Sequence, residues 1–163
     1  MITIAGSGPS CKVYNQHVTI ATKKRSLPSD YVMCRFPCQY AKGGKEKLPL
    51  LLYFNRCHCL GRACPFCNSD PAVEIIPIGH EKWDKYWSKF IRKKILSTHL
   101  KPSLGTCAVF AAVEYFKVDE VGLIGYDHIL DRNENWEHDA IAELACIESL
   151  VNIVDLRQPE AID

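Results

Sequence analysis

The stretch 101–150 constrains the fold of this chain more than any other, because helical and strand patterns alternate along it. An apolar, Ala-rich helix is expected over 103–116, a buried strand over 121–125 and a further helix over 138–151. Chains that alternate strands and helices fold into a mostly parallel sheet with helices on both faces. We therefore predict an α/β fold of the Rossmann-like kind.

The remainder of the chain fits the same architecture. A short β-branched strand, Ile2–Ala5, stops at a glycine-rich turn, which is how doubly wound sheets usually begin. A helix is predicted over 81–96, with apolar residues at helical spacing and basic residues on the other face. The further predicted strands are 17–22, 30–36, 48–55, 73–78 and 152–156. All of them belong to one domain over 1–163, into which a cysteine-rich segment is inserted at 56–71.

Length and composition narrow the class of protein. With 163 residues the chain can bury one sizeable core. Its 20 Lys and Arg residues nearly balance 19 Asp and Glu residues, so net charge indicates no particular partner. The sequence begins without the basic and apolar regions of a signal peptide, and its longest apolar run, 48–54, is far below the ~20 residues of a membrane helix. We expect a cytoplasmic protein, of a bacterium or a virus-infected cell, that does not bind membranes.

Nine cysteines in a chain without an export signal are better interpreted as thiols or metal ligands than as disulfides. Four of them, Cys57, Cys59, Cys64 and Cys67, lie close enough in sequence to bind one tetrahedral zinc ion. Such a structural site would hold together an insertion that lacks a core of its own. Redox chemistry at the Cys64 and Cys67 pair, or thiols without a shared role, are the alternatives.

The turn Gly6-Ser7-Gly8-Pro9-Ser10 is the first candidate ligand site. Glycines let backbone N–H groups approach an anion closely, so Gly6, Ser7, Gly8 and Ser10 are candidate phosphate contacts. The turn lacks the third glycine of a dinucleotide fingerprint and the Gly-Lys-Ser/Thr of a Walker loop. An ordinary strand-to-helix turn would have the same residues.

The start of the predicted helix 103–116 is the second candidate site. Backbone N–H groups point outward at a helix N-terminus, where Ser103 and Gly105 would present them to an anion. Ser103 also suits an N-cap, a role that is compatible with ligand contact. The strand that follows delivers Tyr126 and Asp127 to the carboxyl edge of the sheet, where open α/β folds bind ligands.

His138 and Glu143 lie at the start of the last predicted helix. Five residues turn about 140° around a helix, so the two side chains do not share a face if both are helical. If Asp139 is the N-cap, His138 lies just outside the helix and can point into a cleft. A histidine there can serve as a general base, because it titrates near neutrality. A solvated histidine beside a capping aspartate is the plainer alternative.

The predicted helix 81–96 carries basic residues among aromatic ones. That combination can serve nucleic acid. An ordinary solvated face with an apolar back has the same pattern, so the helix allows an anionic acceptor, nucleic acid included, without requiring one.

Four segments, in this order, resemble the motifs of the eukaryotic-type sialyltransferase family. The strand and turn 2–10 resemble the start of its long motif, and 30–36 resembles the aspartate, apolar strand and Arg-Phe-Asn of that motif. Pro102-Ser103-Leu104-Gly105, with the helix and strand up to Asp127, resembles the small motif. The segment 138–143, with its histidine and glutamate, resembles the very small motif His-x4-Glu.

The resemblance implies a Rossmann-like fold of the variant glycosyltransferase-A kind. It also implies transfer of a sugar from a nucleotide donor, linked to cytidine monophosphate, to an acceptor hydroxyl, with inversion and without a catalytic metal. His138 would deprotonate the acceptor or assist departure of the phosphate, because inverting transfer needs a base on the acceptor side and charge stabilisation at the leaving group. Ser7, Ser103 and Gly105 would contact the nucleotide, and Glu143 would support the last helix or the site.

The sequence departs from the family at two positions. Ser7 stands where asparagine is usual, and Pro37 follows Arg35-Phe36 where the family has asparagine. The chain is also shorter than typical members. Two other hypotheses therefore stay open: a zinc-stabilised module that binds a nucleotide or nucleic acid without turnover, and a nucleotide hydrolase that uses Asp127 and His138.

Overall fold

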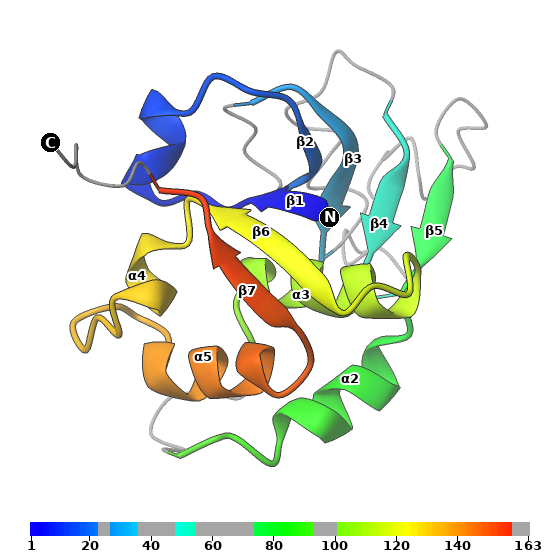
Figure 1. Ribbon diagram of the computed structural model, residues 1–163. Helices are drawn as coiled ribbons and strands as arrows, with labels where there is room; N and C mark the ends of the chain where they lie inside the picture. The colour runs from blue at the N-terminus through cyan, green and yellow to red at the C-terminus, as the bar shows by residue number, and fades with distance from the viewer. Residues whose placement is uncertain (23–26, 36–47, 55–73, 93–100, 158–163) are drawn as a thin grey trace, which may run out of the picture.

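The computed structural model describes residues 1–22, 27–35, 48–54, 74–92 and 101–157 (Figure 1). In chain order their elements are β1 (Ile2–Ala5), the 3-10 helix η1 (Pro9–Val13), β2 (Val18–Thr22), β3 (Ser29–Cys34), β4 (Leu50–Leu52), β5 (Ile75–Pro77), α2 (His80–Trp87), α3 (Leu104–Glu114), β6 (Glu120–Ile124), α4 (Asp127–Leu130), α5 (Ala140–Glu148) and β7 (Asn152–Asp155).

The strands form one sheet in the order β5-β4-β3-β2-β1-β6-β7, and every neighbouring pair is parallel. Ile4 of β1 pairs with Ile20 of β2 on one side and with Leu123 of β6 on the other. Strands buried on both faces are continuously apolar, as in β4, where all three leucines are buried. The all-parallel sheet with its helices confirms the predicted α/β class and is consistent with a Rossmann-like fold.

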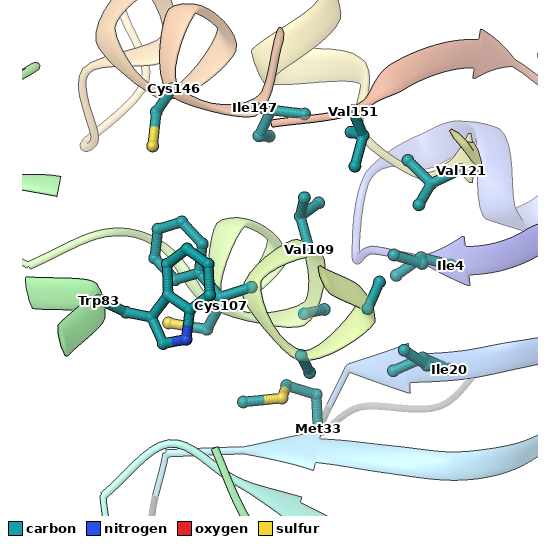
Figure 2. Close-up of a cluster of buried hydrophobic side chains, with 14 of the residues drawn as sticks. Ile4, Ile20, Met33, Trp83, Cys107, Val109, Val121, Cys146, Ile147 and Val151 are labelled. Carbon is teal, nitrogen blue, oxygen red and sulfur yellow. The ribbon is translucent and has the colours of Figure 1, made fainter. Parts of the chain in front are cut away.

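The main core lies between one face of the sheet and the helices α2, α3 and α5 (Figure 1). Successive strand residues point to opposite faces, so Ile4, Ile20 and Met33 face this core from three neighbouring strands. Figure 2 shows Val109 of α3 between these strand residues and Ile147 of α5. Helix α3 is therefore the centre of the core, and its residues 106–112 are all buried.

The other face of the sheet is covered differently. Ala5, Cys11, Val18 and Ala21 form a smaller cluster there, to which η1 contributes its cysteine. We predicted helices on both faces of the sheet. Within the described residues the α-helices pack on the first face, and the 3-10 helix η1 is the helical element on the second.

The helices α2, α4 and α5 differ from the predictions in an informative way. Helix α2 ends at Trp87, and 93–96 of the predicted helix lie outside the described residues. Helix α5 begins at Ala140 because the carboxylate of Asp139 caps it, accepting a hydrogen bond of 3.1 Å from the N–H of Ala142. Helix α4 was not predicted, because a single turn shows no hydrophobic period.

None of the helices in the described part of the chain has the length and apolar character that crossing a bilayer requires.

Candidate active site

The sheet reverses its winding between β1 and β6. After β1 the chain builds β2 to β5 on one side, and it then returns through α2 and α3 to place β6 on the other side of β1. In open α/β sheets the crevice at such a switch point, outside the carboxyl ends of the strands, is where ligands bind. The predicted glycine turn follows β1, and Tyr126 follows β6, so both lie at this point.

The glycine turn packs directly against the end of β6. The N–H of Gly6 donates to the carbonyl of Ile124 at 2.8 Å, and the N–H of Gly8 donates to that of Gly125 at 2.7 Å. A Cβ atom on Gly8 would lie 2.4 Å from the carboxylate of Asp127, so only glycine fits there. The glycines thus allow close packing of the two backbone segments. Among the hydrogen bonds between described residues, those of the turn use the N–H groups of Gly6, Gly8 and Ser10, which leaves the N–H of Ser7 for a ligand.

Asp127 and Ser10 connect the turn to β6 from opposite ends of the chain. The Oδ1 atom of Asp127 accepts hydrogen bonds from the N–H and the hydroxyl of Ser10, at 3.1 and 2.7 Å. The same hydroxyl oxygen accepts one from the N–H of Gly125 at 2.8 Å. This geometry gives both side chains a structural task behind the site.

Tyr126 fills the space between the turn and α3. Its hydroxyl donates to the carbonyl of Gly105 at 2.6 Å. A Cβ atom on Gly105 would lie 3.0 Å from the tyrosine ring, and one on Gly6 would lie 3.2 Å from it. Burial raises the pKa of Tyr126 well above its ordinary value, so the phenol stays neutral and acts as a hydrogen-bond donor.

The N-terminus of α3 opens toward the same space. Ser103 is its N-cap, and the hydroxyl oxygen accepts a long hydrogen bond of 3.5 Å from the N–H of Thr106. The N–H groups of Leu104 and Gly105, in the first turn, have no carbonyl within the helix to bind. Together with the partial positive charge of a helix N-terminus, they favour an anion in front of α3.

Glu143 lies behind this helix start and is completely buried. Its Oε1 atom accepts hydrogen bonds from the N–H of Ser103 at 2.9 Å, from the hydroxyl of Ser103 and from the hydroxyl of Thr106 at 2.5 Å. Burial raises the pKa of Glu143 to about 7, although these hydrogen bonds and the charge of Arg35 act in the opposite direction. Glu143 therefore joins α5 to the first turn of α3.

His138 lies just outside α5, as the interpretation of Asp139 as the N-cap required. Its side chain is 18% exposed, and its Nδ1 atom is 4.0 Å from Oε2 of Glu143. On the other side of the ring, Nε2 is 3.8 Å from the carboxylate of Glu137, a side chain that is largely exposed. The imidazole thus lies between the buried carboxylate of Glu143, near Nδ1, and the exposed carboxylate of Glu137, near Nε2.

A cavity of about 330 Å³ brings these parts together. Of the predicted site residues it is lined by Gly6, Ser7, Gly8, Ser103, Gly105, Tyr126 and His138. Ser10, Asp127 and Glu143 are not among its lining residues and stand behind them. Gly8 of the turn and His138, which are 130 residues apart in the sequence, therefore line the same cavity.

The cavity also has lining residues that the sequence did not single out. Thr22 and Arg35 come from the ends of β2 and β3, and the Nη2 atom of Arg35 donates to the carbonyl of Pro102 at 2.5 Å. Their position at strand ends was the available signal. His128 and Trp136, from α4 and the loop after it, had no periodic pattern to mark them.

The four predicted zinc ligands, Cys57, Cys59, Cys64 and Cys67, lie outside the described residues, as does the insertion 56–71. Within the described residues no three His, Cys, Asp or Glu side chains are grouped so that they could hold a metal ion. Four cysteines of the described part, Cys11, Cys34, Cys107 and Cys146, are buried.

Comparisons of the chain with protein-family models, with curated proteins and with solved structures found no match.

Proposed function

We propose that this protein is a sialyltransferase-like glycosyltransferase. It moves a sugar from a nucleotide donor, linked to cytidine monophosphate, to an acceptor hydroxyl with inversion. The observation that carries this proposal is the shared cavity, because Ser7, the N-terminus of α3 and His138 all line it. An anion site and a base facing one space are the two elements that such a transfer needs.

The anion end of the cavity suits a phosphate. The N–H groups of Leu104 and Gly105, the N–H of Ser7 and the guanidinium of Arg35 are hydrogen-bond donors around it. The phosphate oxygen that was bonded to the sugar gains negative charge as that bond breaks. Donors fixed in advance stabilise such a developing charge without further reorganisation.

The histidine end suits the acceptor. Nε2 of His138 accepts the proton of the acceptor hydroxyl while the oxygen forms its bond to the anomeric carbon. The bond from that carbon to the phosphate oxygen breaks on the opposite face, and cytidine monophosphate leaves with the electron pair. Glu143, 4.0 Å from Nδ1, positions the ring and stabilises the imidazolium when its carboxyl group is ionised.

Asp127 has a different role in the proposed transfer from its role in the hydrolase hypothesis. Its Oδ1 atom binds the N–H and hydroxyl of Ser10, and its residue does not line the cavity. We therefore assign Asp127 as a positioning residue for the glycine turn, and His138 as the catalytic residue of the proposal.

The test is nucleotide release from a panel of CMP-, UDP- and GDP-linked sugars, with and without a mixture of simple glycoside acceptors. We expect CMP release from a CMP-linked donor, and a decrease of about 10²-fold or more in the His138→Ala variant. His17→Ala is the matched control, since His17 is exposed, contacts Asp30 and does not line the cavity. Release from none of the donors, or an unchanged rate in His138→Ala with the His17→Ala rate intact, would contradict the proposal.

A further inference from the structure

One wall of the cavity is aromatic. The rings of His128 and Trp136 lie nearly parallel, at 12°, with their centroids 5.4 Å apart. The ring of Trp136 is also 4.9 Å from that of His138, at a tilt of 56°. All three residues line the cavity, so the indole stands between the proposed base and a second histidine.

Hydrogen bonds fix the orientation of His128. The Oδ1 atom of Asn133 accepts a hydrogen bond from the N–H of Asn135 at 3.0 Å, which identifies the other amide atom as nitrogen. That Nδ2 atom lies 3.0 Å from Nδ1 of His128 and donates to it. The neutral imidazole then carries its proton on Nε2, so this ring adds a hydrogen-bond donor to the aromatic wall.

The wall lies at the acceptor end of the cavity. Along the carboxyl edge of the sheet, Arg35 follows β3, Thr22 ends β2, the anion site follows β1, and His128 follows β6. The ring of His138, the proposed base, lies 4.9 Å from that of Trp136. The molecule beside Trp136 is then the one whose hydroxyl His138 deprotonates.

From this placement we infer that Trp136 and His128 form an acceptor subsite for a pyranose ring, which makes Trp136 a residue that determines acceptor specificity. The inference rests on the proposed function. A pyranose has an apolar C–H face that packs on an aromatic ring and hydroxyl groups that bind polar atoms at its rim. The wall offers both, with the indole as the apolar surface and the Nε2–H of His128 and the carboxylate of Glu137 as polar partners.

The experiment uses tryptophan fluorescence of the whole protein. Of the three tryptophans, Trp83 and Trp87 are only 3% and 2% exposed, so acrylamide quenching reports mainly on Trp136. We measure the quenching constant with methyl pyranosides in excess, with the acyclic hexitol sorbitol and with cytidine. The Trp136→Phe variant shows which part of the quenching comes from Trp136, because removal of the indole should abolish most of it.

We expect at least one methyl pyranoside to lower the quenching constant about twofold, and sorbitol and cytidine to leave it unchanged. In the transfer assay Trp136→Ala should raise the acceptor KM about tenfold and leave the donor KM unchanged, with Trp136→Phe close to the original protein. Protection by cytidine instead, or by no pyranoside, would overturn the inference. CMP release from the donor would persist in that case, whereas failure of the proposed function would abolish that release.

Discussion

The Nδ1 atom of His138 lies 4.0 Å from Oε2 of Glu143, although the two residues would be on different faces of one helix. They meet because the cap at Asp139 leaves His138 outside α5, while Glu143 is in its first turn and reaches inward. The two oxygens of Glu143 have different tasks. Oε1 is held by Ser103 and Thr106 at the start of α3, and Oε2 faces the histidine without a hydrogen bond from any described residue.

The burial of Glu143 predicts a specific pH dependence of stability. Its pKa is raised by burial from 4.5 to about 7, so the folded protein holds this proton more tightly than the unfolded chain does. The stabilisation that the protonated Glu143 gives to the folded state is therefore fully present below about pH 4.5 and is lost as pH rises through about 7. Glu143→Gln keeps the shape without the charge and should be as stable as the original protein at pH 4.5, and about 3 kcal/mol more stable at pH 8. Urea unfolding at several pH values measures this difference.

Glu114→Gln is the control for that experiment, because the pKa of Glu114 is shifted in the opposite direction from that of Glu143. The pKa of Glu114 is lowered by its hydrogen bond from Lys82, and its carboxylate is partly exposed. Its contribution is present above its ordinary pKa and is lost as pH falls, so Glu114→Gln should be slightly less stable at neutral pH, by about 1 kcal/mol or less. Parallel pH profiles of the two variants would refute the account of Glu143.

A pair of glycine substitutions tests the close contact between the turn and β6. Gly125 has φ +74°, and a Cβ atom there would lie 2.3 Å from the sulfur of Cys11 and 2.7 Å from the carbonyl oxygen of Gly6. Gly79 has φ +90°, but a Cβ atom there would have no neighbour within 4 Å. We expect Gly79→Ala to lose about 1 kcal/mol and Gly125→Ala about 3 kcal/mol or more, measured by urea unfolding. Equal losses of unfolding free energy in the two variants would show that backbone strain, and not the close contact with Cys11 and Gly6, determines both.

The positioning role of Asp127 predicts rescue by asparagine. An asparagine oxygen can still accept from the N–H and hydroxyl of Ser10, whereas Asp127→Ala leaves them without this acceptor. Asp127→Ala should lower the unfolding free energy by about 1–3 kcal/mol, and Asp127→Asn by clearly less. Asp127→Asn should also retain CMP release from the donor. Complete loss of release in a stable Asp127→Asn protein would favour the hydrolase hypothesis.

The zinc site stays a prediction from the spacing of Cys57, Cys59, Cys64 and Cys67. Elemental analysis of protein purified without added metal should find about one zinc per chain. Substitution of Cys64 and Cys67 by serine should abolish that zinc, whereas Cys34→Ser, at a buried cysteine of the described core, should not. Protein without zinc, in which Cys57, Cys59, Cys64 and Cys67 of the folded chain react with a label, would rule the site out.

Local patterns were sufficient for much of the fold. The strands near Ile4, Ile20 and Leu123 were predicted because a run of β-branched or apolar residues bounded by turns is a local signal. The pairing of β1 with β6 was not predicted, because it joins segments about 120 positions apart. It follows from the return of the chain through α3, whose residues 106–112 are all buried.

The site was predictable where its residues sit next to such patterns. Ser103, Gly105 and His138 adjoin helix starts, and the structure places them on one cavity. The bond between Ser10 and Asp127 spans 117 positions, so nothing local distinguished their structural task from a catalytic one. Trp136 lies in irregular chain after a single helical turn, where side chains follow no period.

The most direct measurement of the central claim is a titration of the isotope-labelled protein with CMP, followed through its amide NMR signals. The signals of Ser7, Leu104, Gly105 and His138 should shift together with one dissociation constant, because they face one cavity, while that of Val13, an exposed residue of η1, should stay unchanged. Shifts of the turn without His138, or no shift of these amides at saturating CMP, would contradict a single nucleotide site between the glycine turn and the histidine.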